Sequence, residues 1–167
     1  MAALQSWSSA PGDELHAFQR QAVSPCKLAF IAHSSLHAQF EQHPHLSGVF
    51  WRETLIDAAI FCEWVVNVGR RPALTRMAHL LCEFFLRHEA VGLVTDHAFA
   101  FPITQNELAD ATGLSNVHVN RTLQELRSRG LIGEQGRLLK VLDWEGLQRA
   151  GEFDPTYLHQ EPSDKTA

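Results

Sequence analysis

Side chains that can contact DNA bases gather in one short stretch, residues 115–124. Asn116, Asn120 and Arg121 lie there, together with Val117. Arginine can donate two hydrogen bonds to O6 and N7 of guanine, and asparagine can pair in the same way with N6 and N7 of adenine. These residue types therefore suit contacts to base edges in the major groove of double-stranded DNA.

An apolar stripe predicts that this stretch is a helix and indicates which face points outward. Val119, Leu123 and Leu126 follow one another at intervals of four and three residues, which is typical of an amphipathic helix. Ser115, in front of them, is a good N-cap. At 100° per residue, the base-contacting candidates point away from the stripe and lie mostly in the opening turns. Those turns reach base edges in helix-turn-helix proteins.

A shorter helix is expected just before this one. Thr104 is followed three residues later by Glu107, which predicts a capping box at a helix start. Gly113 can adopt the left-handed conformation that ends a helix in a sharp turn. Residues 102–131 therefore predict two helices joined by a tight turn. Helix pairs of this kind also occur in proteins that do not bind DNA, so this spacing alone leaves a purely structural role open.

A β-hairpin is expected after Gly130. Residues 131–134 and 137–142 predict two strands, and Gln135 with Gly136 favours a tight turn between them. A hairpin in this place predicts a wing beside the two helices, and a wing favours DNA binding.

The stretch Pro102 to Leu142 resembles the winged helix-turn-helix domain of the Crp/Fnr family of bacterial transcription regulators. The run LSNVHVNRTLQELRSRGLI is similar to the recognition helix of that family, with its serine cap, base-contacting positions, and Leu and Gly before the wing. The best-known members carry Arg and Glu where this sequence has Asn116 and Val117. The resemblance therefore implies the guanine contact of Arg121, but not the operator sequence. It also implies RNA polymerase as a partner.

The expected DNA contacts form two groups. Contacts to phosphates fix the register of a protein on the duplex, and contacts to bases give sequence preference. We expect base contacts from Asn116, Val117, Asn120 and Arg121, and phosphate contacts from Thr104, Asn106, Ser115, Arg127 and Arg137.

The segment before residue 45 resembles the end of the sensor domain in the same family. Cys26 to Ile31 alternates enough to predict a strand, and SPCKLAFIAHSSL is similar to the last strand of the family's effector-binding β-roll. Ser34 or Ser35 can cap a short helix that runs to Glu41. The phosphate-binding motif of the cyclic-nucleotide branch and the N-terminal cysteine cluster of the Fnr branch have no counterpart. We therefore expect no cofactor, neither a cyclic nucleotide nor an iron–sulfur cluster.

A long helix is expected from Leu46 to Val68. Its polar residues occupy only one arc, so most of its surface is apolar and must be covered on more than one side. Crp/Fnr proteins dimerise through a helix at this position, and a two-fold dimer would present two recognition helices to a palindrome. The alternative is a helix buried in the core of a monomer. We expect the homodimer contacts to come from Phe50, Thr54, Phe61 and Trp64.

The remaining elements complete a mainly α protein with small β elements, an α+β fold. Pro72 suits the first turn of a helix that runs to Arg87, 99–101 predicts a short strand that pairs with the wing, and Asp143 can cap a helix over 144–150. The expected domains are residues 1–44, the truncated end of a sensor β-roll; 45–69, the dimerisation helix; 70–158, the winged helix-turn-helix domain; and 159–167, a disordered tail.

Composition limits the other possibilities. The chain has 167 residues and a net charge of −5, but residues 102–142 hold five Lys or Arg against four Asp or Glu, so the acidity lies elsewhere. Three scattered cysteines, Cys26, Cys62 and Cys82, suit reduced, buried positions. No apolar run approaches the roughly eighteen residues of a membrane span, and no signal-peptide pattern begins the sequence, so we expect a cytoplasmic protein without a membrane partner.

Two other functions stay open at this stage. The chain could be an interaction module that pairs with other regulators through its long helix. It could also be a metal- or redox-responsive regulator, because Cys26 and four histidines lie near its start: His33, His37, His43 and His45. No nucleophile elbow, phosphate loop or HExxH motif occurs, so we expect no enzyme activity.

Overall fold

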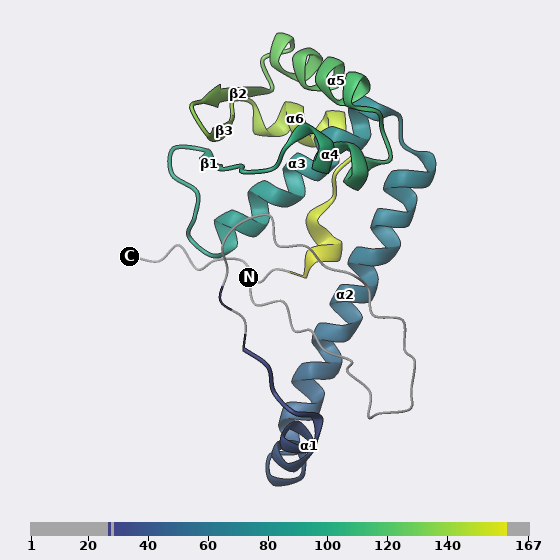
Figure 1. The fold of residues 1–167 in the computed structure, drawn as a ribbon, viewed down its shortest axis with the longest axis vertical. Coiled ribbons are helices and arrows are strands. Elements are labelled where there is room, and N and C mark those ends of the chain that lie inside the picture. Colours follow the sequence, from purple (N-terminus) through teal and green to yellow (C-terminus); the bar gives the residue numbers. More distant parts are fainter. Residues whose placement is uncertain (1–26, 28, 160–167) are drawn as a thin grey trace. The chain divides into compact units, whose positions relative to one another are not determined.

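The computed structural model describes residue 27 and residues 29–159 (Figure 1). The chain divides into two compact units, residues 1–50 and 51–167. No helix in the described ranges is long and apolar enough to cross a membrane. Most of the predicted β-roll remnant, residues 1–44, and the tail after His159 lie outside the described residues.

The first unit contains helix α1 (His33–Gln42) and the start of α2 (His45–Arg70). The rings of Phe40 and Phe50 pack edge to face with centroids 5.2 Å apart. The predicted serine cap is wrong, because α1 begins at His33 after Ala32, which makes no side-chain cap bond. The predicted strand is also wrong over residues 29–31, which have no regular structure. A strand needs a hydrogen-bonding neighbour, and the strands in the described part of the chain all lie within 98–141.

The second unit is built around α3 (Ala73–Ala90), with α5 (Asn116–Ser128) and α6 (Trp144–Gly151) packed against it (Figure 1). The α3 side chains of Met77, Ala78, Leu81 and Cys82 are fully buried. Helix α3 starts one residue after Pro72, which is its N-cap rather than its first helical residue. A 3₁₀ turn over Pro155–Leu158 closes the unit and buries Leu158.

A small antiparallel sheet lies beside the helices. Its order is β1 (Ala98–Ala100), β3 (Leu138–Val141), β2 (Ile132–Gln135), and Phe99 pairs with Leu139. The prediction that the short strand pairs with the wing is therefore confirmed. The hairpin turn falls on Gly136 and Arg137, one residue later than expected, because Gly136 is the residue that takes the positive φ, 64°.

Candidate nucleic-acid interface

The first helix of the predicted pair is α4 (Gln105–Thr112), and local hydrogen bonds set both of its ends. The Glu107 backbone N–H donates to Thr104 Oγ1 at 3.3 Å, and the Thr104 N–H donates to Glu107 Oε2 at 2.7 Å. Gly113 ends the helix in the left-handed region, with φ at 64°. The capping box and the glycine turn are confirmed, so the turn angle between α4 and α5 is encoded within about ten residues.

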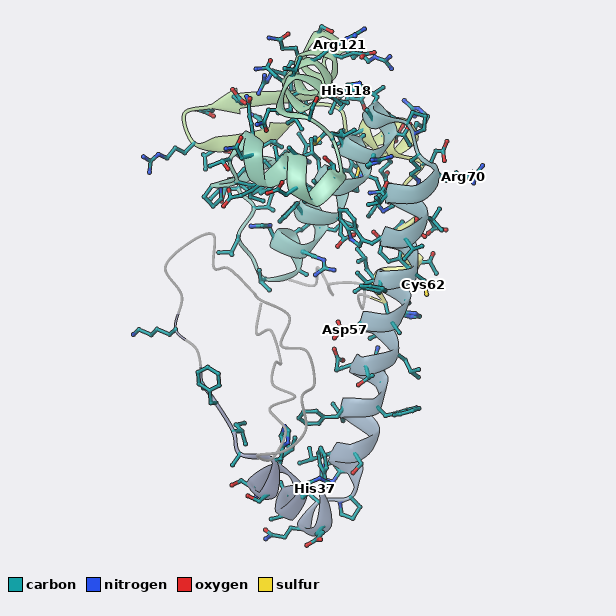
Figure 2. The ribbon with its side chains drawn as sticks, turned by 45° about the vertical axis from the view of Figure 1, so that its right-hand side comes forward. His37, Asp57, Cys62, Arg70, His118 and Arg121 are labelled. Carbon is teal, nitrogen blue, oxygen red and sulfur yellow. The ribbon has the colours of Figure 1, made fainter. Side chains whose placement is uncertain are left out.

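The second helix, α5, presents the expected outward face. The Ser115 hydroxyl accepts a hydrogen bond from the His118 N–H at 3.3 Å, which caps the helix. Val119 and Leu126 are fully buried and Leu123 is nearly so. Figure 2 shows Arg121 on the outer side of this helix.

All four predicted base-contacting residues are exposed. Val117 has 80% of its surface accessible, so its side chain is open to contact from outside the chain. Asn116, Asn120 and Arg121 surround it on the first turns of α5. The structure therefore brings the four residues together on one open face, and their role in contacting bases stays a prediction.

Some of the residues predicted to contact phosphates are exposed, and others already have a carboxylate partner within the chain. Ser115 and Asn106 are exposed, and so is Arg137 in the wing turn. Thr104 donates its hydroxyl proton to Glu107 Oε2 at 2.8 Å, so it can accept but not donate a hydrogen bond while the capping box is closed. Arg127 is paired with Glu134 of the wing. A phosphate would have to compete with a carboxylate at both Thr104 and Arg127.

Ion pairs occupy some of the arginines at this surface and leave other cations unpaired. Arg127 binds Glu134, and Arg129 lies 2.5 Å from Glu125. The i, i+4 spacing of Glu125 and Arg129 could have been found in the sequence, whereas the pair between α5 and β2 depends on the hairpin's position. Among the described residues, no carboxylate is paired with Arg121, Arg137 or Lys140. Within residues 29–159 these three cations therefore have no ion-pair partner that a DNA phosphate would have to displace.

The exposed face of α2 has the spacing of a helix that packs against another helix. Exposed residues recur at intervals of four and three, and the large ones, Trp51, Leu55 and Val65, keep 54–66% of their surface accessible. We call this stripe the α2 seam; it consists of Trp51, Leu55, Ala58, Cys62, Val65 and Gly69. A regular alternation of three and four is the a/d pattern of a helix pair.

The four predicted dimerisation residues fall in different places. Thr54 and Phe61, which is 71% exposed, flank the seam. Phe50 packs on Phe40, and Trp64 faces its own chain, where its Nε1 donates to Glu83 Oε2 at 3.0 Å. Asn67 is the single buried residue of α2 in the described structure, which does not favour the alternative of a helix buried in the core of a monomer.

The cysteine prediction is half right for the residues that the structure describes. Cys82 is buried, and burial raises the pKa of its thiol well above the ordinary range. Cys62 is exposed, as the seam requires, so the prediction of a buried residue is wrong there (Figure 2). Cys26 lies outside the described residues.

His33 and His37 both belong to α1, one turn apart. Within 27 and 29–159, no group of three or more His, Cys, Asp or Glu side chains could hold a metal ion. Two ligands do not make a closed site, so the described chain offers the metal-responsive alternative no third ligand.

Residues 75–150 match the model of the Crp-like helix-turn-helix domain. These residues therefore form a Crp-like helix-turn-helix domain. The predicted resemblance and the α+β fold are thereby confirmed. In a domain of this type, α4 and α5 are the two helices of the helix-turn-helix, and β2 with β3 forms the wing. We call these four elements the reading unit.

Proteins similar to this chain include named regulators. A probable transcriptional activator of Rhizobium leguminosarum bv. viciae is 28% identical over 130 residues, which cover 77% of this chain and 54% of that protein. The transcriptional activator protein FnrL of Cereibacter sphaeroides is 26% identical over 147 residues, covering 85% and 59%. The chain thus spans little more than half the length of these curated relatives.

Solved structures show the same fold. FixK2 from Bradyrhizobium japonicum superposes with a TM-score of 0.65 at 23% identity, covering 72% of this chain and 59% of FixK2. A CooA mutant from Carboxydothermus hydrogenoformans gives a TM-score of 0.56 at 17% identity, covering 71% and 54%.

Proposed function

We propose that this chain is a sequence-specific, DNA-binding transcription regulator of the Crp/Fnr type that acts as a homodimer on a palindromic operator. The observation that carries the proposal is the open polar face on the first turns of α5, where Asn116, Asn120 and Arg121 surround an exposed Val117. A Ser115 cap and a glycine turn hold that face in the geometry that enters a major groove.

Charge supports the same role. Arg121 on α5 and Arg137 and Lys140 in the wing lie on the reading unit without carboxylate partners among the described residues. Base contacts would come from Asn116, Val117, Asn120 and Arg121. Phosphate contacts would come from Asn106, Ser115 and Arg137. Thr104 and Arg127 would also contact phosphates once a phosphate displaces the carboxylates of Glu107 and Glu134. A DNA-binding role implies a cytoplasmic protein, and relatives named as activators favour RNA polymerase as a further partner.

The α2 seam supports the homodimer. Ile60 and Trp64, which pack against the core of the unit, lie on the side of α2 opposite the seam at 100° per residue. One face of α2 is therefore satisfied within the chain, and the other exposes apolar side chains at a/d spacing. A second copy of α2 covers such a stripe with identical spacing, which is the isologous contact of a two-fold dimer.

Selection of bound sequences from a random duplex pool tests the function. We expect enrichment of an inverted repeat whose half-sites lie about 10 base pairs apart, centre to centre. Mobility shifts at two salt concentrations, with the selected palindrome and a scrambled duplex, separate sequence preference from charge attraction. Binding without sequence preference at either salt concentration would overturn the proposal and favour an interaction module.

Substitution on α2 tests the dimer separately. Leu55→Lys puts a charge into the seam and should convert a dimer to a monomer in sedimentation equilibrium. Asp57→Lys introduces the same side chain at an exposed position off the seam (Figure 2), and should leave the dimer intact. A wild-type chain that sediments as a monomer, or equal behaviour of the two variants, would contradict the proposed seam.

A further inference from the structure

The end of α2, the start of α3 and the turn of the reading unit meet at one side chain, Arg76. Its NH1 donates to the Thr112 carbonyl at 2.5 Å, and its NH2 donates to the Arg71 carbonyl at 2.9 Å. Arg71 lies in the short link between α2 and α3, and Thr112 is the last residue of α4. A single guanidinium therefore binds two segments that are 41 positions apart in the chain.

Both carbonyls are groups that need such a donor. The last carbonyls of a helix have no partner within the helix, and the C-terminal end of a helix carries partial negative charge. Arginine suits this place because its planar fork directs several N–H groups in fixed directions. The contact is therefore directional as well as charged, and it defines the angle between the two segments.

The turn after α4 also lies directly against α2. A Cβ atom built on Gly113 would lie 3.6 Å from Arg76 NH1 and 3.7 Å from Val68 Cγ1. Gly113 leads into α5, so the start of the recognition helix is held next to the end of the seam-bearing helix.

The other side of the junction is held by buried polar groups. Asn67 is fully buried, and its Nδ2 donates to the Arg76 carbonyl at 3.4 Å. Arg71 NH2 lies 2.6 Å from Glu63 Oε1, within the last two turns of α2 and the link. The Asn67 contact ties the end of α2 to α3, and the Arg71 contact ties the link to α2. Arg76 adds a connection from these segments to the reading unit.

We propose that Arg76 is a positioning residue that sets the angle of α5 relative to α2, and through it the half-site spacing that the dimer recognises. The inference rests on the proposed function. In a two-fold dimer the separation of the recognition helices follows from the angle between each helix and the dimer axis. Loosening that angle broadens the accepted spacing without changing how one reading unit contacts one half-site.

The test uses the full chain and a duplex panel derived from the selected palindrome. The panel contains the palindrome, versions with one base pair inserted or deleted at its centre, and a single half-site. We expect Arg76→Ala to bind the single half-site like the wild type, while the preference for the correct spacing falls by about tenfold. Arg70→Ala removes the same charge at the exposed end of α2 (Figure 2), and should keep the wild-type preference.

The outcomes distinguish this proposal from the proposed function. An Arg76→Ala protein that is folded by circular dichroism and keeps a sharp spacing preference overturns the proposal. Equal losses on the half-site and the palindrome also overturn it, because Arg76 would then only stabilise the reading unit. If Arg76→Ala does not fold, Arg76→Lys carries the test, since one ammonium keeps the charge but not the planar fork. A wild type without palindrome preference refutes the proposed function before any variant is made.

Discussion

Tyr157 donates its hydroxyl proton to Glu83 Oε2 at 2.8 Å, although 74 residues separate them. The same oxygen accepts the Trp64 indole N–H at 3.0 Å, and Glu83 Oε1 lies 2.7 Å from Arg87. One buried carboxylate therefore joins α2, α3 and the C-terminal 3₁₀ turn. Both carboxylate oxygens have hydrogen-bond or ion-pair partners, which is the condition for a buried charge to be tolerated.

Tyr157 should resist ionisation. Burial, followed by the negative charge and the hydrogen bond of Glu83, raises the pKa of its phenol well above the usual value of 10. It is the single tyrosine of the chain, so alkaline titration of tyrosinate absorbance reports on it alone. We expect no ionisation near pH 10 until the protein unfolds, and a smaller pKa shift in Glu83→Gln. A titration with a midpoint near 10 in folded protein would contradict the arrangement.

His79 should make the protein sensitive to acid. Burial, and then the nearby Arg71, lowers the pKa of the imidazole from 6.5 to about 4. Between these values the unfolded chain binds a proton that the folded chain does not, so this stability is present above pH 6.5 and declines as the pH falls toward 4. The loss approaches about 1.4 kcal/mol per pH unit, about 3 kcal/mol in total.

Urea denaturation from neutral pH down to pH 4 measures this effect. His79→Gln lacks the titrating group, so its free energy of unfolding should fall less steeply with acid than that of the wild type. The comparison of slopes matters, because the variant also loses the contacts of His79 to Gly151 O at 3.3 Å and the Tyr157 hydroxyl at 3.0 Å. Parallel slopes in the two proteins would show that another group causes the acid sensitivity.

Glu134 should weaken non-specific DNA binding by holding Arg127. Glu134→Gln frees the guanidinium for a phosphate, so affinity for random duplex should rise and the slope of log K against log salt should steepen by about one contact. The pair is exposed, so stability should change by less than about 1 kcal/mol. Glu145→Gln makes the same charge change on α6, where Glu145 pairs with Arg149. If Glu145→Gln gains the same affinity for random duplex, the change in net charge, and not the release of Arg127, explains the result.

Substitutions of Arg121 and Arg137 should affect DNA binding differently, because the first residue is expected to contact a base and the second a phosphate. Arg121→Ala should lose about 1–3 kcal/mol on the selected site and relax its preference at one base pair, with little change on random DNA. Arg137→Ala, in the wing turn, should lose similar affinity on both duplexes, because a phosphate contact carries no sequence information. Competition assays with the two duplexes measure both variants. If Arg121→Ala weakens both duplexes equally, Arg121 contacts a phosphate instead of a base.

The reading unit could be predicted from the sequence because its signals are local. The Thr104 and Ser115 caps, the left-handed Gly113 and the stripe of Val119, Leu123 and Leu126 each depend on residues a few positions apart. The same holds for the approximate boundaries of α2, whereas β1 also needs β3, far along the chain, as its hydrogen-bonding partner. Caps, turns and periodicity act within one or two turns of chain, so tertiary contacts did not alter them.

The features that could not be predicted depend on residues far apart in the chain. Periodicity showed that α2 is apolar on several sides, but only the tertiary structure decided that Trp64 faces its own core through Glu83 and that Cys62 lies exposed on the seam. The Arg127 pair with Glu134 and the Arg76 contact to Thr112 likewise depend on where the wing and the α4 turn come to lie. A side chain's partner across the fold is determined by how helices pack, and helix packing is not written in the spacing of any one helix.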